Sequence, residues 1–100
     1  MAQILIEREH QLGLPQARRT AAQWVQDAER KFDLRCDYQP GDEGDAVSFS
    51  RSGLSGTLEV SGTTFRMQAQ LGFLLSGFKD RIEAEIQKNL DELIASHAKA

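Results

Sequence analysis

The sequence predicts an α+β fold in which a single antiparallel sheet of about five strands is covered on one face by two helices. Two observations carry this prediction. Apolar and polar residues alternate through much of the chain, which is typical of strands that are buried on one side. Two other segments repeat their apolar residues at i, i+3, i+4 and i+7, which is typical of amphipathic helices. The expected order is β-α-β-β-β-β-α, with the long C-terminal helix gripped by the sheet.

The first strand and the first helix are predicted by the N-terminal third of the chain. Residues 3–8 read as a strand that ends before His10 and Gly13. Pro15 then stands in the first turn of a helix, where proline is accepted because the N–H groups of that turn have no partner within the helix. The apolar face of this helix is made by residues at helical spacing: Ala17, Ala21, Trp24, Val25, Ala28 and Phe32. We expect Trp24 to be buried against the sheet.

Four more strands are predicted between the two helices. Leu34, Cys36 and Tyr38 alternate with polar residues up to a loop at 40–45, and three further alternating segments are separated by turns rich in glycine and serine. The polar partners fall in one phase and should face solvent: Ser48, Ser50, Thr57, Glu59, Ser61, Arg66, Gln68 and Gln70. The sheet should therefore have one buried face.

The C-terminal quarter predicts one long amphipathic helix, marked by apolar residues at helical spacing: Phe78, Ile82, Ile86, Leu90, Leu93 and Ile94. The segment before it is more apolar than a connection requires. Two interpretations of Phe73, Leu74, Leu75 and Phe78 stay open: they cap the end of the core, or they form a contact surface for a partner, a second copy or a lipid-like phase. Ser96 to Ala100 carry no apolar period and are expected to fray.

The composition is that of one globular domain spanning residues 1–100, with 40% hydrophobic and 27% charged residues. The net charge of -3 gives no electrostatic reason to approach nucleic acid or an anionic membrane. The single cysteine, Cys36, excludes an internal disulfide and fits a reducing compartment. No apolar run approaches the length of a signal peptide core or a transmembrane segment, so a cytoplasmic location is expected.

Candidate catalytic groups are few. The two histidines, His10 and His97, and Cys36 show none of the close spacings that zinc sites use, so no metal or cofactor is expected. His10 stands beside Glu9 and could act as a base, but an exposed or locally hydrogen-bonded loop histidine is the favoured interpretation. Cys36 falls in phase with inward-facing residues and should behave as a core side chain. The lack of paired catalytic groups favours a nonenzymatic protein.

The chain resembles the small bacterial proteins of the polyhydroxyalkanoic acid system family over nearly its whole length. The similar stretches are IEREHQLGLPQARRTAAQW, SFSRSGLSGTLEVSG and, most specifically, LGFLLSGFKDRIEAEIQKNLDELIA. The resemblance implies association with polyhydroxyalkanoate storage and supplies no catalytic residue. It suggests an accessory protein, located at storage granules, that binds the granule surface, the polyester synthesis machinery or a second copy through residues 73–78.

A weaker likeness is to helix-grip folds, in which a sheet and a long C-terminal helix hold an apolar ligand. This likeness implies an alternative function, as a small binding module or enzyme for a hydroxyacyl or fatty-acyl molecule. An unfilled apolar cavity beside Trp24, Phe65 and Ile82 is the observation that would favour it. The chain is much shorter than those folds, and the missing catalytic groups favour granule or partner binding.

Overall fold

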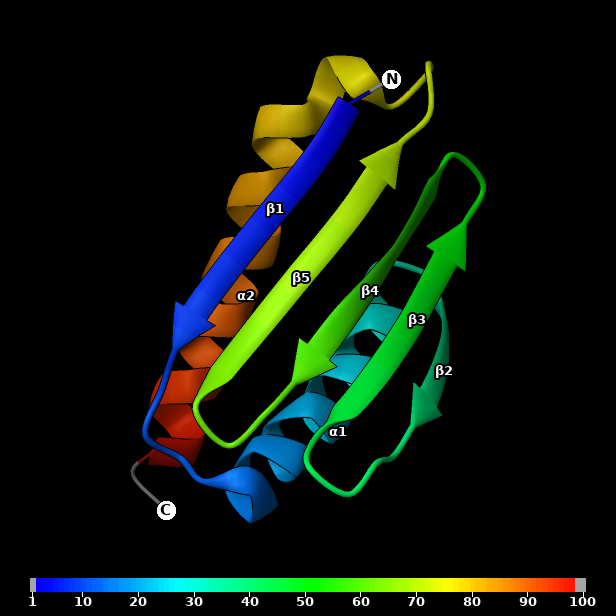
Figure 1. Cartoon of the computed structure of the whole chain (residues 1–100). Coiled ribbons are helices and arrows are strands. Elements are labelled where there is room, and N and C mark those ends of the chain that lie inside the picture. The colour runs from blue at the N-terminus through cyan, green and yellow to red at the C-terminus, as the bar shows by residue number, and fades with distance from the viewer. Residues whose placement is uncertain (1, 99–100) are drawn as a thin grey trace.

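The computed structural model describes residues 2–98, and these residues form one sheet and two long helices (Figure 1). The elements in chain order are β1 (Ala2–Glu9), α1 (Leu14–Lys31), β2 (Arg35–Gln39), β3 (Asp45–Arg51), β4 (Leu54–Val60), β5 (Thr64–Leu71), the short 3-10 helix η1 (Ser76–Phe78) and α2 (Lys79–Ala98). The predicted order β-α-β-β-β-β-α is thereby confirmed.

All neighbouring strands of the sheet are antiparallel, in the order β1-β5-β4-β3-β2. The last four strands form a meander, and β1 adds to its far edge beside β5. In the resulting register Ile4 stands opposite Ala69, and Met67 stands opposite Leu58. Because β1 and β2 lie at opposite edges, the connection between them must cross the sheet, and α1 makes that crossing.

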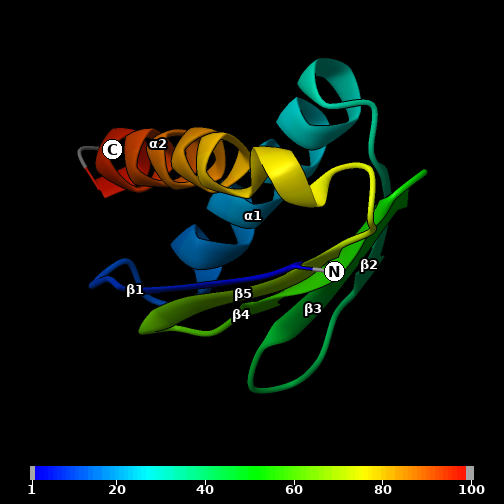
Figure 2. The same cartoon turned by 90° about the horizontal axis from the view of Figure 1, so that it is seen from above.

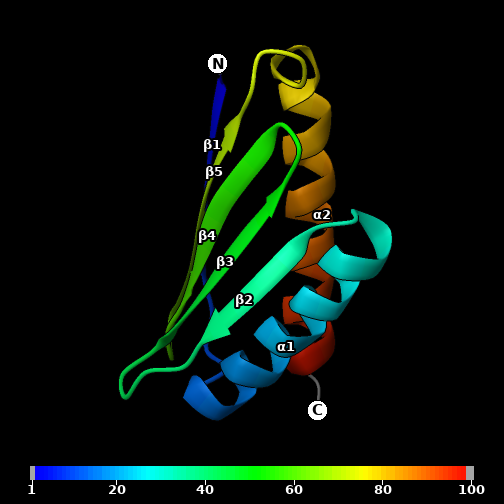
Figure 3. The same cartoon turned by 90° about the vertical axis from the view of Figure 1, so that its right-hand side faces the viewer.

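Both helices lie on the same face of the sheet, as the sequence predicts. Figure 1 shows α2 behind β1 and β5 and α1 behind β3 and β4, and Figure 2 shows both helices on the same side of the sheet. Seen edge-on in Figure 3, the sheet has both helices on one side and nothing from residues 2–98 on the other. The predicted polar phase of strands β3 to β5 faces that open side, where Ser48, Gln68 and Gln70 are exposed. The prediction of a sheet with one buried face is confirmed.

Helix α1 packs closely on the sheet because three of its six buried residues are alanine. Ala17, Ala21 and Ala28 are almost completely buried. Trp24 supplies the one large ring of the stripe and is 3% exposed, which confirms the expected burial. Its ring meets that of Phe49 edge to face, with centroids 5.3 Å apart, an arrangement that adds to the stabilisation from burial alone.

Helix α2 begins later than the apolar spacing alone suggests. Residues 73–75 form a turn and Ser76–Phe78 form η1, so Phe78 precedes the helix and is 57% exposed instead of joining its buried stripe. Leu90 is the fully buried residue of α2, and the rest of its apolar stripe is half-buried: Ile82, Ile86, Leu93 and Ile94. The helix continues to Ala98, and residues 99–100 of the predicted tail lie outside the described residues.

Candidate functional site

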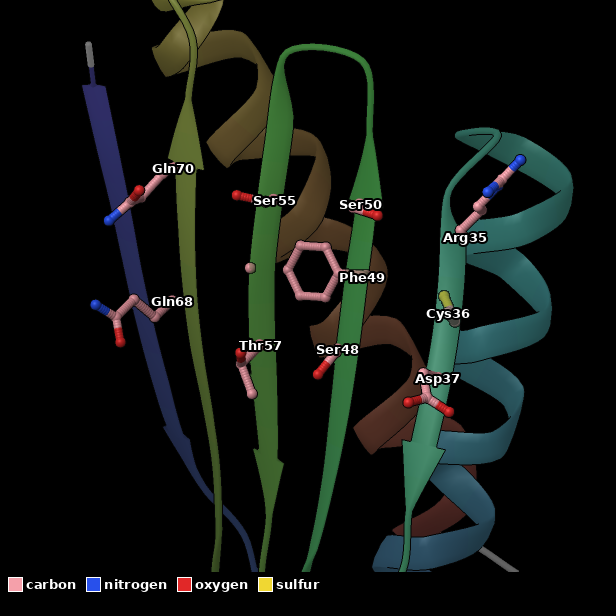
Figure 4. A pocket seen from close by; sticks show the side chains of 11 residues that line it. Arg35, Cys36, Asp37, Ser48, Phe49, Ser50, Ser55, Thr57, Gln68 and Gln70 are labelled. Carbon is pink, nitrogen blue, oxygen red and sulfur yellow. The ribbon is translucent and has the colours of Figure 1, made fainter.

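A shallow hollow of about 610 Å³ lies on the outer face of the sheet, over β2 to β5 (Figure 4). Short hydroxyl side chains of β3 and β4 form its floor, with Gln68 and Gln70 on one side and Arg35 and Asp37 on the other. Gly56 of β4 shares the inward phase of Leu54 and Leu58, and a Cβ there would lie 2.6 Å from Cζ of Phe49 on the helix-covered face. The hollow is an open, polar part of the sheet surface.

A second hollow, an apolar cavity of about 340 Å³, lies on the helix-covered face near the β3–β4 turn. The C-terminal part of α1 and the residues after it contribute Trp24, Phe32 and Leu34 to its wall. The sheet contributes Phe49 and Leu54, which belong to β3 and β4. The end of α1 and the β3–β4 hairpin therefore meet around one apolar space.

Helix α2 forms the opposite wall of this cavity through Ile82 and Ile86, which are one helical turn apart. Both side chains are only half-buried although they lie on the predicted apolar stripe. The cavity between them and the strands accounts for this. Leu75 and Phe78, from the connection between β5 and α2, complete the lining.

Three charged residues also line the cavity: Arg51, Arg81 and Glu85. The guanidinium of Arg51 donates from Nη1 to the backbone carbonyl of Phe32 at 2.9 Å, which ties the β3 end to the end of α1. Within residues 2–98, neither Arg81 nor Glu85 forms an ion pair at 4.0 Å or less. Sequence reasoning missed both arginines. Arg51 shares the period-two phase of Phe49, and an arginine in an inward phase is the signal that could have revealed it.

The predicted contact residues before α2 divide into two groups. Phe73 and Leu74 are each 84% exposed and Phe78 is 57% exposed, and we call these three residues the entrance patch. Leu75 departs from them because it is half-buried, packs against the core and lies beside Gly53 of the β3–β4 turn. Gly53 has a φ of +83°, which favours glycine, and a Cβ there would be 3.2 Å from Cδ1 of Leu75.

His10 lies at the other end of the sheet from the cavity lining, in the connection between β1 and α1. Its ring stacks on Phe65 with centroids 4.5 Å apart, and its Nδ1 accepts a hydrogen bond from the backbone N–H of Leu12 at 3.1 Å. Burial lowers the pKa of His10. The interpretation of His10 as a locally hydrogen-bonded loop histidine is confirmed, although the residue is buried. Phe65, which the helix-grip alternative places beside an apolar cavity with Trp24 and Ile82, packs against His10 and does not line the apolar cavity.

Cys36 faces inward from the edge strand β2, opposite Phe49, and is half-buried. Burial raises the pKa of its thiol, and the nearby carboxylate of Glu29 raises it further. Both effects disfavour the nucleophilic thiolate. The backbone carbonyl of His97 accepts a hydrogen bond from the side-chain amide of Gln16 at 2.9 Å.

Asp45 is a buried carboxylate at the start of β3, with a fully buried side chain. It accepts hydrogen bonds from the Tyr38 hydroxyl, from the Gly41 N–H at 3.0 Å and from Nε of Arg18 at 3.0 Å. Burial by itself raises the pKa of Asp45, but these donors outweigh burial and hold its pKa below the ordinary value. Burial and the contact with Asp45 raise the pKa of Tyr38. The cluster joins α1 to the β2–β3 loop.

Within the described residues, no group of three or more His, Cys, Asp or Glu side chains is arranged to hold a metal ion. None of the helices described here is both long enough and apolar enough to span a membrane.

The fold and site define a small α+β domain with one open antiparallel sheet, two helices on one face and an apolar cavity beneath the longer helix. The family model described as "Putative polyhydroxyalkanoic acid system protein" matches residues 4–94. The chain belongs to that family. The match includes β1 from Ile4 onward, the other four strands, α1 and most of α2. A comparison with curated proteins gave no match.

Proposed function

We propose that the protein is a nonenzymatic accessory protein that binds polyhydroxyalkanoate granules through the entrance patch. Membership of the polyhydroxyalkanoic acid system family supports a role in the storage of this polyester. The observation that carries the binding role is the exposure of Phe73, Leu74 and Phe78, three large apolar side chains within six residues of one another. Large apolar side chains that are exposed close together in the chain are candidates for a contact site.

Binding through the entrance patch should be driven by removal of apolar surface from water. Full burial of a Leu or Phe side chain contributes about 1.5–3 kcal/mol. The net charge of -3 gives no general attraction to an anionic surface. Binding should therefore persist from about 0.1 M to about 1 M salt, although the Debye length falls from about 10 Å to about 3 Å over that range.

The test is cosedimentation of the purified protein with native granules over that salt range. Leu74→Ser should weaken the association about 5- to 30-fold, because it removes about 1–2 kcal/mol of apolar contact. Leu5→Ser is the matched control, since Leu5 is 66% exposed but belongs to β1 on the outer face of the sheet. Equal pelleting of both variants and the parent protein would show that the patch does not bind granules.

A catalytic role is the competing hypothesis, and it is tested by an activity assay beside the cosedimentation. If the intact protein neither pellets with granules nor binds their proteins, and instead turns over a hydroxyacyl thioester, the accessory role is wrong. That result would favour the alternative of a small acyl-binding enzyme.

A further inference from the structure

The apolar cavity between α1, the sheet and α2 adjoins the entrance patch and shares one residue with it, Phe78. Its walls are the rings of Trp24, Phe32 and Phe49 and the aliphatic side chains opposite them on α2. Leu74 and Phe73 do not line it. Ligand sites are typically concave and mostly apolar, with a few polar groups that orient the ligand, and this cavity has that composition.

The volume of the cavity limits what it can hold. About 340 Å³ lies at the lower end of the range of about 300–1,000 Å³ for small-molecule sites. At about 30 Å³ for each water-sized group, it accommodates roughly eleven such groups, and a methylene is similar in size to a water molecule. An unbranched chain of roughly eight to ten carbons with a small polar head matches this volume.

The charged residues of the lining indicate the sign of that head. The lining contains two guanidiniums, those of Arg51 and Arg81, and one carboxylate, that of Glu85, so positive groups outnumber negative ones. The hydrogen bond to the Phe32 carbonyl holds Arg51 in place, and it uses only one of the five N–H donors of the guanidinium. Arg81 is exposed, without an ion pair inside the described range. Guanidiniums bind carboxylates with paired, charge-assisted hydrogen bonds.

We infer that this cavity binds a monocarboxylate with an unbranched apolar tail of roughly eight to ten carbons, with the carboxylate at Arg51 and Arg81 and the tail against Trp24 and Ile86. This inference goes beyond granule binding and does not depend on it. A free fatty acid or hydroxy fatty acid carries this chemistry, and so does the carboxyl end of a polyester chain.

Trp24 gives a direct readout because it is the only tryptophan of the chain and lines the cavity. Decanoate, decanol and butyrate are titrated into the full-length protein, followed by Trp24 emission and by calorimetry. Decanoate should bind saturably at one site and change the emission. Decanol should bind about tenfold more weakly, because it lacks the charge, and butyrate should show no saturable binding. No saturable binding of decanoate overturns the inference.

Variants of the cavity residues distinguish the contact with the carboxylate of the ligand from the contact with its apolar tail. Arg81→Gln should weaken decanoate about tenfold and leave decanol unchanged, whereas Arg66→Gln, on the outer face of the sheet, should change neither. Ile82→Phe should fill the cavity and weaken both ligands. Arg81 is exposed, so its variant tests the inference even if Ile82→Phe fails to fold. Equal affinities for decanoate and decanol that Arg81→Gln leaves unchanged would overturn the carboxylate assignment.

Two further measurements identify the source of the ligand and distinguish ligand binding in the cavity from granule binding at the entrance patch. A 3-hydroxyacyl oligomer with a free carboxylate is titrated beside decanoate, and tighter binding of the oligomer assigns the site to polyester chain ends. Leu74→Ser should leave decanoate affinity unchanged. If Leu74→Ser abolishes decanoate binding while the fold is retained, the ligand sits on the entrance patch and the cavity assignment is wrong.

Discussion

Leu74 and Leu75 are adjacent in the chain but have opposite environments. The Leu74 side chain is 84% exposed, whereas Leu75 is half-buried between the β3–β4 turn and the apolar cavity. The turn at 73–75 produces this difference, because it directs consecutive side chains away from one another. A stretch that reads as uniformly apolar is therefore divided into a surface part and a packed part.

The first prediction follows from that division. Leu75→Ser should lower the free energy of unfolding by about 1–2 kcal/mol, because it removes a half-buried side chain. Leu74→Ser should change it by no more than about 0.5 kcal/mol. Urea unfolding followed by far-ultraviolet circular dichroism measures both values. Equal destabilisation by the two variants would show that Leu74 is also part of the core.

Trp24 should contribute a large share of the stability. Trp24→Ala should cost about 3–5 kcal/mol, since it removes a ring that is 3% exposed and leaves a space against Phe49. Trp24→Phe, which keeps an aromatic ring there, should cost less. Urea denaturation compares the variants, and iodide should quench the native Trp24 emission only weakly. Strong quenching would contradict its burial.

Asp45 should stabilise the fold only above acidic pH. The pKa of Asp45 is about 3.9 in the unfolded chain and lower in the folded protein. The contribution of Asp45 to folding stability is therefore fully present above about pH 3.9, and it is lost as the pH falls through the folded pKa. Asp45→Asn should therefore lower stability by about 1–3 kcal/mol at neutral pH, with the difference shrinking in acid. Asp42→Asn, in the exposed loop, is the control. A difference that is constant with pH would show that the charge of Asp45 is unimportant.

Cys36 should react slowly with thiol reagents in the folded protein. Burial and the carboxylate of Glu29 raise the pKa of the thiol, so less thiolate is present at about pH 8 than in the unfolded chain. Labelling rates in buffer and in urea, corrected with a free-thiol standard, measure the difference. Equal rates in the two conditions would mean that Cys36 is open to solvent in the native state.

Much of this architecture could be predicted because it depends on local spacing. Period-two alternation placed Ser48 and Gln68 on the open face and Phe49 on the covered face, since successive side chains of a strand point to opposite sides. Helical spacing likewise identified Trp24 as inward-facing. Both kinds of pattern can be recognised within a single segment, without knowledge of what packs against it.

The sequence by itself therefore determined the strands, the helices and the buried face of each. The tertiary structure decided where α2 begins, that Leu75 packs while Leu74 does not, and that Arg51 and Arg81 line one apolar cavity with Trp24. These features depend on how far α2 stands from the sheet and on how the β5–α2 connection turns beside Gly53. That placement results from packing between segments distant in the chain, and no local periodicity encodes it.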